Sequence, residues 1–172
     1  MIGLEYLTFS GAHLTQMPRE VSRLSKLKKL SVFIVGKEEG CGIEELKDLN
    51  FLGSKLRIEN LQSVTDATQA NLMDKKNIID LKLRWDSQSC NDPDIIINDT
   101  VVINDLQPHR NLKKLTISDY AGSKFPTWMM STSIHLPNLV YISLDGCNKC
   151  EQLPALGELQ SLRYLYMHGL RG

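Results

Sequence analysis

The sequence has no long hydrophobic run, no net charge and few cysteines. Its 172 residues include 20 Lys and Arg and 20 Asp and Glu, so the formal net charge is zero. Without an excess of positive charge, we expect neither nucleic acid nor an acidic membrane surface as a partner. The 26 leucines are spread along the whole chain. They form no apolar stretch of about 20 residues, so we expect no membrane span.

The amino terminus lacks the features of a targeting signal. No basic segment followed by an apolar segment, the arrangement of a secretory signal, precedes the first apolar repeat. With 42% hydrophobic and 23% charged residues, the composition is that of a soluble globular domain. We therefore expect a single domain over residues 1–172 and a cytoplasmic or nuclear location.

The four cysteines are too few and too unevenly spaced for a disulfide scaffold. Cys147 and Cys150 form a CxxC pair, which can supply half of a zinc site or a redox pair. Cys41 and Cys90 are isolated, and the four histidines show no paired spacing that would complete a metal site. We expect free thiols and no metal.

The motifs of common enzymes are also missing. Gly36-Lys37-Glu38 is not the GxxxxGK[S/T] loop that cradles phosphate, and no GxSxG nucleophile motif occurs. Carboxylates are numerous, but the chance proximity of two acids does not make an acid–base couple. We expect neither catalysis nor a cofactor bound to this chain.

A repeated pattern of apolar residues runs through the chain. The spacing LxxLxL, with Ile, Phe, Val or Met allowed, recurs at steps of 23, 26, 25, 34, 27 and 23 residues. Apart from one longer interval, these steps lie at or just above the period of leucine-rich repeats. The copies are Leu4/Leu7/Phe9, Leu27/Leu30/Val32, Gly53/Leu56/Ile58, Ile78/Leu81/Leu83, Leu112/Leu115/Ile117, Leu139/Ile142/Leu144 and Leu162/Leu165/Met167, of which the third is degenerate at Gly53.

The spacing has a physical cause. The alternating pair of a short strand faces one side, and the leucine three positions earlier enters the same core from the incoming loop. Apolar residues at three-residue intervals between strands, such as Ile43, Leu46 and Leu49, indicate helical turns on the outer side. No single unit can bury its apolar face, so the units must stack. The sequence thus predicts an α/β leucine-rich-repeat solenoid of about seven repeats, with a curved parallel sheet and a helical or irregular convex side.

Two local features fit this frame. Cys147 lies three residues after Leu144, where the repeat favours a buried Asn or Cys, so a structural role explains the CxxC pair better than a metal does. The longest interval contains a polar, acidic and turn-rich stretch after Trp85, before apolar periodicity resumes at Ile95. We expect a surface insertion over residues 86–99.

The residues between the leucines form four ordered motifs. They are Lys55-Leu56-Arg57-Ile58-Glu59-Asn60-Leu61, Leu106-Gln107-Pro108-His109-Arg110-Asn111-Leu112, Gly122-Ser123-Lys124-Phe125-Pro126-Thr127-Trp128 and Leu136-Pro137-Asn138-Leu139, the last followed by Cys147, Cys150 and Leu153-Pro154. Together these motifs resemble the repeats of plant disease-resistance proteins of the coiled-coil, nucleotide-binding, leucine-rich-repeat type. The resemblance covers essentially the whole chain.

The resemblance implies an intracellular immune receptor. Its repeats would sense a pathogen effector or a guarded host protein and would hold the nucleotide-binding module inactive beforehand. ATP or ADP would bind only to that module, which this chain lacks, so the resemblance implies a fragment of a longer array. The alternative is a generic leucine-rich-repeat interaction scaffold outside immunity, because many unrelated binding proteins use such repeats.

The residues that flank the strand leucines are expected on the concave surface of the sheet. The middle strands carry the cations that we name the basic strip: Lys29, Lys55, Arg57, Lys82, Arg84 and Lys114. The last two strands carry the residues that we name the tyrosine end: Tyr141, Tyr164, Tyr166 and His168. We expect the basic strip to contact an acidic surface of the nucleotide-binding module. Aromatic side chains often anchor interfaces, so the tyrosine end is expected to contribute to ligand recognition.

Overall fold

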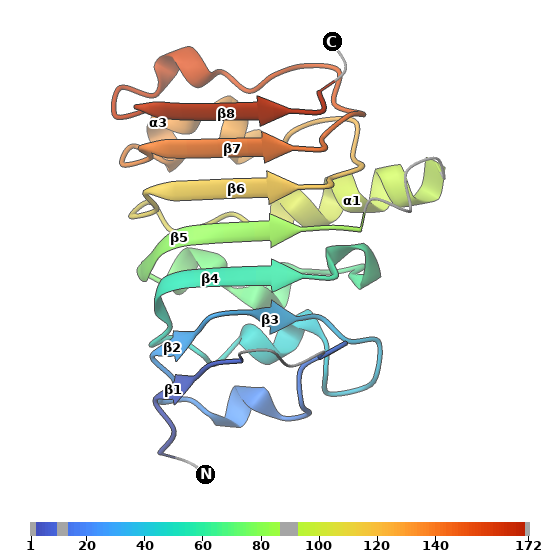
Figure 1. Ribbon diagram of the computed structural model, residues 1–172, viewed down its shortest axis with the longest axis vertical. Helices are drawn as coiled ribbons and strands as arrows, with labels where there is room; N and C mark the ends of the chain where they lie inside the picture. Colours follow the sequence, from blue (N-terminus) through green and yellow to red (C-terminus); the bar gives the residue numbers. More distant parts are fainter. Residues whose placement is uncertain (1–2, 10–13, 87–92, 171–172) are drawn as a thin grey trace.

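Parallel strands follow one another along the chain in the computed structural model, which describes residues 3–9, 14–86 and 93–170 (Figure 1). The first two strands pair with each other, and the next six form one sheet in the order β3-β4-β5-β6-β7-β8. The strands are β1 (Tyr6–Leu7), β2 (Lys29–Leu30), β3 (Phe33–Ile34), β4 (Gly53–Glu59), β5 (Asn77–Arg84), β6 (Lys114–Ser118), β7 (Tyr141–Asp145) and β8 (Tyr164–His168).

The segments that connect the strands form a second layer behind the sheet (Figure 1). Most of these segments are single turns of 3-10 helix, at Val21–Arg23, Ile43–Leu46, Leu61–Ser63, Thr68–Ala70, Leu72–Asp74 and Leu156–Glu158. The α-helices are α1 (Pro93–Asp105), α2 (Thr127–Met130) and α3 (Thr132–His135). No helix within the described part of the chain is long and apolar enough to cross a membrane. This architecture confirms the predicted α/β leucine-rich-repeat solenoid.

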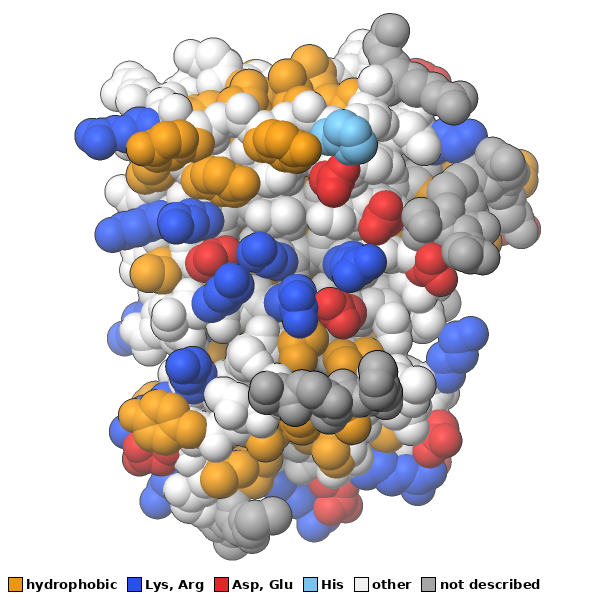
Figure 2. All heavy atoms as spheres, in the orientation of Figure 1, with side chains coloured by type: hydrophobic (Ala, Val, Ile, Leu, Met, Phe, Trp, Pro, Cys, Tyr) orange, Lys and Arg blue, Asp and Glu red, His pale blue; other side chains and the backbone are white. Residues whose placement is uncertain are grey.

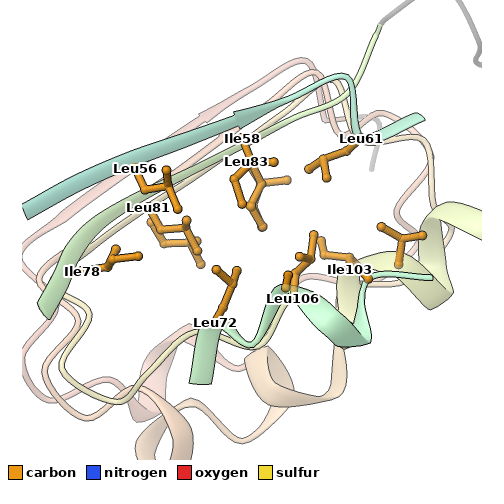
Figure 3. Close-up of a cluster of buried hydrophobic side chains, with 14 of the residues drawn as sticks. Leu56, Ile58, Leu61, Leu72, Ile78, Leu81, Leu83, Ile103 and Leu106 are labelled. Carbon is orange, nitrogen blue, oxygen red and sulfur yellow. The ribbon is translucent and has the colours of Figure 1, made fainter. Parts of the chain in front are cut away.

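The core lies between the sheet and the convex layer. Alternate residues of β4 and β5 point away from the concave face and meet apolar side chains of the convex segments (Figure 3). The labelled residues are Leu56, Ile58, Leu61, Leu72, Ile78, Leu81, Leu83, Ile103 and Leu106, all of which are buried. Each fully buried side chain of this size contributes about 1.5–3 kcal/mol, so the repeat leucines are the main source of stability.

Two of the predicted repeat copies differ from the structure. In the second copy, Phe33 rather than Val32 lies opposite Ile58. The strand is interrupted between β2 and β3, and this interruption places one extra residue between Leu30 and the next core position. In the third copy, Leu52 rather than Gly53 supplies the buried side chain that precedes the strand. The register of β4 then shifts between Ser54 and Lys55, where Ser54 has a φ of 66°.

The last copy differs in burial. Leu165 and Met167 of β8 are 45% and 43% exposed, whereas Ile142 and Leu144 at the equivalent positions of β7 are fully buried. Among the described strands, β8 pairs only with β7, so the apolar residues of β8 are covered from one side alone.

Helix α1 overlaps the expected surface insertion. Residues 93–99 of that insertion form the first half of the helix, and Asp99 is only 1% exposed. Val102 and Ile103 in the second half are fully buried, so the helix packs into the convex layer. Residues 93–98 are exposed or half-buried, so this part of the insertion is a helix with its first turns at the surface, and residues 87–92 lie outside the described residues.

The concave face as the candidate binding site

The register of the sheet arranges the concave side chains in three rows that run across the strands. The amino row contains Lys55, Asp80, Lys114, Tyr141 and Tyr164. The middle row contains Arg57, Lys82, Thr116, Ser143 and Tyr166. The carboxyl row contains Arg84, Ser118, Asp145 and His168, with Glu59 at the end of β4. Neighbours within a row are about 4.8 Å apart across the strands.

The amino row alternates in charge. Asp80 lies opposite Lys55 on one side and opposite Lys114 on the other. Opposite charges on neighbouring strands attract each other, and at a solvated surface each such pair contributes roughly 0–1 kcal/mol. The acid therefore offsets much of the local positive potential in this row.

In the carboxyl row, acids lie beside Arg84 and His168. The Arg84 Nε atom lies 3.7 Å from Asp119 Oδ2, and His168 Nδ1 lies 2.9 Å from Asp145 Oδ1. Asp119 follows β6 directly and has a φ of 59°, and its amide donates to the carbonyl of Asp145. A Cβ on Gly146, which has a φ of 68°, would lie 2.9 Å from Asp119 Oδ1, so this close turn requires glycine.

The middle row is different because two cations face each other directly and no acid lies in the row. Arg57 is paired with Lys82 across β4 and β5. Glu59 of the same strand is ion-paired with Arg57, with 3.0 Å between Glu59 Oε1 and Arg57 Nε. Within the described residues Lys82 forms no ion pair. Figure 2 shows this cluster of Lys and Arg at the centre of the concave face.

A hollow of about 310 Å³ lies over the middle and carboxyl rows. Its wall is formed mainly by Arg57, Lys82, Arg84, Thr116, Ser118 and two carboxylates, Asp119 and Asp145. The two carboxylates already contact Arg84 and His168 respectively. The hollow therefore presents donors of Arg57, Lys82 and Thr116 in the middle row and the hydroxyl of Ser118 in the carboxyl row.

The tyrosine end forms an exposed aromatic surface over β7 and β8. The rings of Tyr141 and Tyr164 are neighbours, with centroids 6.5 Å apart and planes at 40°. Tyr164 and Tyr166 are 63% and 52% exposed. Aromatic groups are typical anchors of protein interfaces.

The predicted site residues thus fall into distinct environments rather than one strip. Lys29 is exposed but belongs to β2, in the separate two-stranded sheet. Asp80, Glu59 and Asp119 interleave with the other cations. The sequence analysis did not select Ser118 and Asp119 as site residues. Ser118 is the last residue of β6 and Asp119 follows it, so their place at the carboxyl end of a predicted strand was the signal that could have found them.

The CxxC pair lies on the other side of the sheet, away from this face. Cys147 and Cys150 are buried, and their Sγ atoms contact the backbone carbonyls of Ile117 and Gly122 at 3.9 and 3.3 Å. Burial raises the pKa of both thiols to about 12, so they are protonated at neutral pH. These contacts support the structural role expected from the repeat frame. Cys90 lies outside the described residues.

Comparison with known proteins assigns these repeats to a family. A family model described as R13L1/DRL21 LRRs matches residues 43–170. RGA1 of Solanum bulbocastanum is 38% identical over 157 residues, which cover 90% of this chain and 15% of that protein. The RPP13-like protein 1 of Arabidopsis thaliana is 37% identical over 150 residues, which cover 83% of this chain and 14% of that protein.

A third relative, disease resistance protein RGA2 of Solanum bulbocastanum, is 36% identical over 149 residues, or 84% of this chain and 15% of that protein. All three relatives carry disease resistance in their names, and this chain spans about one seventh of their length. No solved structure matches the chain. The chain belongs to the R13L1/DRL21 family of leucine-rich repeats, and its relatives are plant disease resistance proteins.

Proposed function

We propose that this chain is the protein-recognition and autoinhibitory repeat region of an intracellular plant immune receptor in the cytoplasm or nucleus. Arg57, Lys82 and Arg84 dock on an acidic surface of the receptor's nucleotide-binding module and hold that module inactive. ATP or ADP binds to the module rather than to the repeats. The tyrosine end contributes to recognition of a pathogen effector or a guarded host protein.

The observation that carries this proposal is the pairing of Arg57 with Lys82 across β4 and β5, where Lys82 forms no ion pair among the described residues. The chain as a whole has no net charge, and acids lie next to the cations of the rows on either side: Asp80 in the amino row and Asp119 beside Arg84. Like charges directly opposite each other on neighbouring strands repel and weaken the isolated sheet. An acidic partner relieves that repulsion, so the arrangement favours association over a purely structural role. Repeats of this family are typically interaction modules rather than enzymes.

Binding of the chain to a nucleotide-binding module supplied in trans tests the docking. The triple variant Arg57→Glu, Lys82→Glu, Arg84→Glu changes the surface charge by six units and should weaken docking severalfold. The unmutated chain should bind more weakly as salt increases, because counterions screen exposed charges, and the variant should lose this salt dependence.

A matched control reverses three cations outside the concave rows. Lys26, Lys47 and Lys76 are exposed, and their replacement by Glu changes the net charge by the same six units. This control should dock almost as well as the unmutated chain. If the triple variant on the concave face binds as tightly as before at low and high salt, the charged rows are only a solvated surface and the docking proposal fails.

The tyrosine end predicts a separate phenotype in a full-length receptor. Tyr164→Ala with Tyr166→Ala removes two exposed rings and should reduce activation by the recognised ligand while leaving the resting state silent. The triple charge reversal should instead release the module and cause cell death in leaf tissue without a pathogen. A generic scaffold outside immunity is indicated if neither the module nor an immune response depends on these residues.

A further inference from the structure

We propose that the hollow over the middle and carboxyl rows is a binding site for a dianionic phosphoryl group. It lies on the concave face between β4 and β7 and has a volume of about 310 Å³. Its donors come from three neighbouring strands: Arg57 of β4, Lys82 of β5, and Thr116 and Ser118 of β6. The proposal concerns this chain alone and does not depend on docking to a nucleotide-binding module.

The charges of the hollow favour an anion at one side. Arg57 and Lys82 face each other, and Lys82 forms no ion pair among the described residues, whereas Arg57 is ion-paired with Glu59. The two carboxylates of the hollow lie in or beside the carboxyl row, and each is already in contact with a cation or a histidine. An oxyanion between Arg57 and Lys82 therefore gains the unpaired charge of Lys82 and hydrogen-bond donors from both side chains.

The number of donors distinguishes a phosphoryl group from a carboxylate. An arginine carries five N–H groups and a lysine three, and the hydroxyls of Thr116 and Ser118 add one each. A carboxylate accepts about four hydrogen bonds and carries one charge. A phosphoryl group offers three terminal oxygens and up to two charges, and arginine matches its geometry with two parallel hydrogen bonds. The donor set and the paired cations both fit the larger anion better.

Titration of the chain with inorganic phosphate, followed by amide chemical shifts, tests the site directly. Saturable shifts should appear at residues 57, 82, 116 and 118. The affinity should rise with pH through the second ionisation of phosphate, whereas the affinity for sulfate, which stays a dianion, should remain flat. Shifts that do not saturate, or that are as large with chloride at equal ionic strength, would overturn the proposal.

Variants separate a built site from a general effect of charge. Arg57→Gln with Lys82→Gln should weaken phosphate binding at least tenfold. The control Lys55→Gln with Lys114→Gln removes the same charge from the amino row, whose lysines flank Asp80 and do not line the hollow, and should weaken phosphate binding less than threefold. Thr116→Val leaves the charge unchanged and should weaken binding about threefold, because one hydroxyl donor is lost. Equal losses in the two double variants would contradict the proposal.

Comparing a phosphorylated peptide with inorganic phosphate shows whether the phosphoryl group belongs to a protein or to a free phosphate ester. A short phosphoserine peptide that binds tenfold more tightly than inorganic phosphate assigns the site to a phosphorylated protein, and equal affinities assign it to a free phosphate ester. Phosphate binding without docking of the nucleotide-binding module leaves this proposal standing and removes the proposed function. Docking of the module without phosphate binding overturns this proposal and leaves the proposed function standing.

Discussion

Charged groups are exposed to solvent or half-buried on the concave face of the sheet, whereas two of them are buried in the convex layer behind it. On the concave face, the charges of β4 to β6 are exposed or half-buried, and several have a partner within 4 Å. In the convex layer, Lys75 and Asp99 are almost fully buried, and their Nζ and Oδ1 atoms have no hydrogen-bond partner among the described residues. The comparison teaches that substitutions on the convex side should change stability, and those on the concave side should change binding.

The largest expected effect comes from placing a charge among the repeat leucines. Leu144 is fully buried in β7, so Leu144→Asp buries a carboxylate with no partner and should lower the free energy of unfolding by several kcal/mol. Circular dichroism and thermal melting check this result. A variant with native melting behaviour would show that Leu144 is not a core residue and that the two faces do not differ as described.

The buried Asp99 should destabilise the protein at neutral pH. Burial raises the pKa of its carboxyl to about 6, and the nearby Trp85 indole and Ala121 amide oppose that rise only in part. A carboxyl whose pKa is higher in the folded state than in the unfolded state favours folding while protonated. Stability should therefore fall as pH rises from about 4 to 6, by up to roughly 3 kcal/mol.

Asp99→Asn isolates this effect because it keeps the size of the side chain and removes its charge. The variant should be more stable than the unmutated chain at pH 7, and the gain should vanish near pH 4. Urea unfolding at several pH values measures both. A loss of stability at pH 7 would mean that the ionised carboxylate makes favourable contacts.

Lys75 should show the mirror-image pH dependence. Burial lowers the pKa of its amine to about 8, so the amine loses its proton more readily in the folded state than in the unfolded state. The charged amine costs stability below pH 8, and this cost should disappear as pH rises towards 10.5. Lys75→Met should stabilise the chain at pH 7 by about 1–3 kcal/mol, as judged by urea unfolding. An unchanged unfolding midpoint would show that the amine reaches solvent.

The CxxC pair should show the smallest effect. Because both thiols are buried and protonated, the purified chain should contain no zinc, and a chelator should leave its melting temperature unchanged. Elemental analysis and melting with EDTA check this. One equivalent of zinc, lost together with the fold on chelation, would show that the cysteines hold a metal.

The strands could be predicted from sequence because their side-chain spacing is imposed by the geometry of the repeat. Leu56, Leu81 and Leu115 recur at the predicted positions, and each is buried in its strand. Helix α1 was harder to predict, since Ile95, Ile96 and Ile97 are β-branched and follow an acidic, turn-rich stretch. Packing of Val102 and Ile103 in the convex layer overrides that weak local preference.

The candidate site was only partly predictable, because the repeat pattern sets which residues face the concave side but does not set every contact between them. The repeat frame aligns Leu56 with Leu81 and so predicts that Arg57 and Lys82 are neighbours on the concave side. The register of β4 and β5 confirms this pairing. The position of the Asp119 carboxylate beside Arg84 depends on a left-handed backbone conformation that no sequence motif announced.

One pair of variants on adjacent residues of β5 tests the division between the two faces most directly. Leu83 is fully buried on the convex side, whereas Lys82 is only partly buried on the concave side. Leu83→Glu should lower the free energy of unfolding by several kcal/mol. Lys82→Glu should change it by less than about 1 kcal/mol, because it places an acid opposite Arg57 at a solvated site. Equal destabilisation by the two variants would contradict the account.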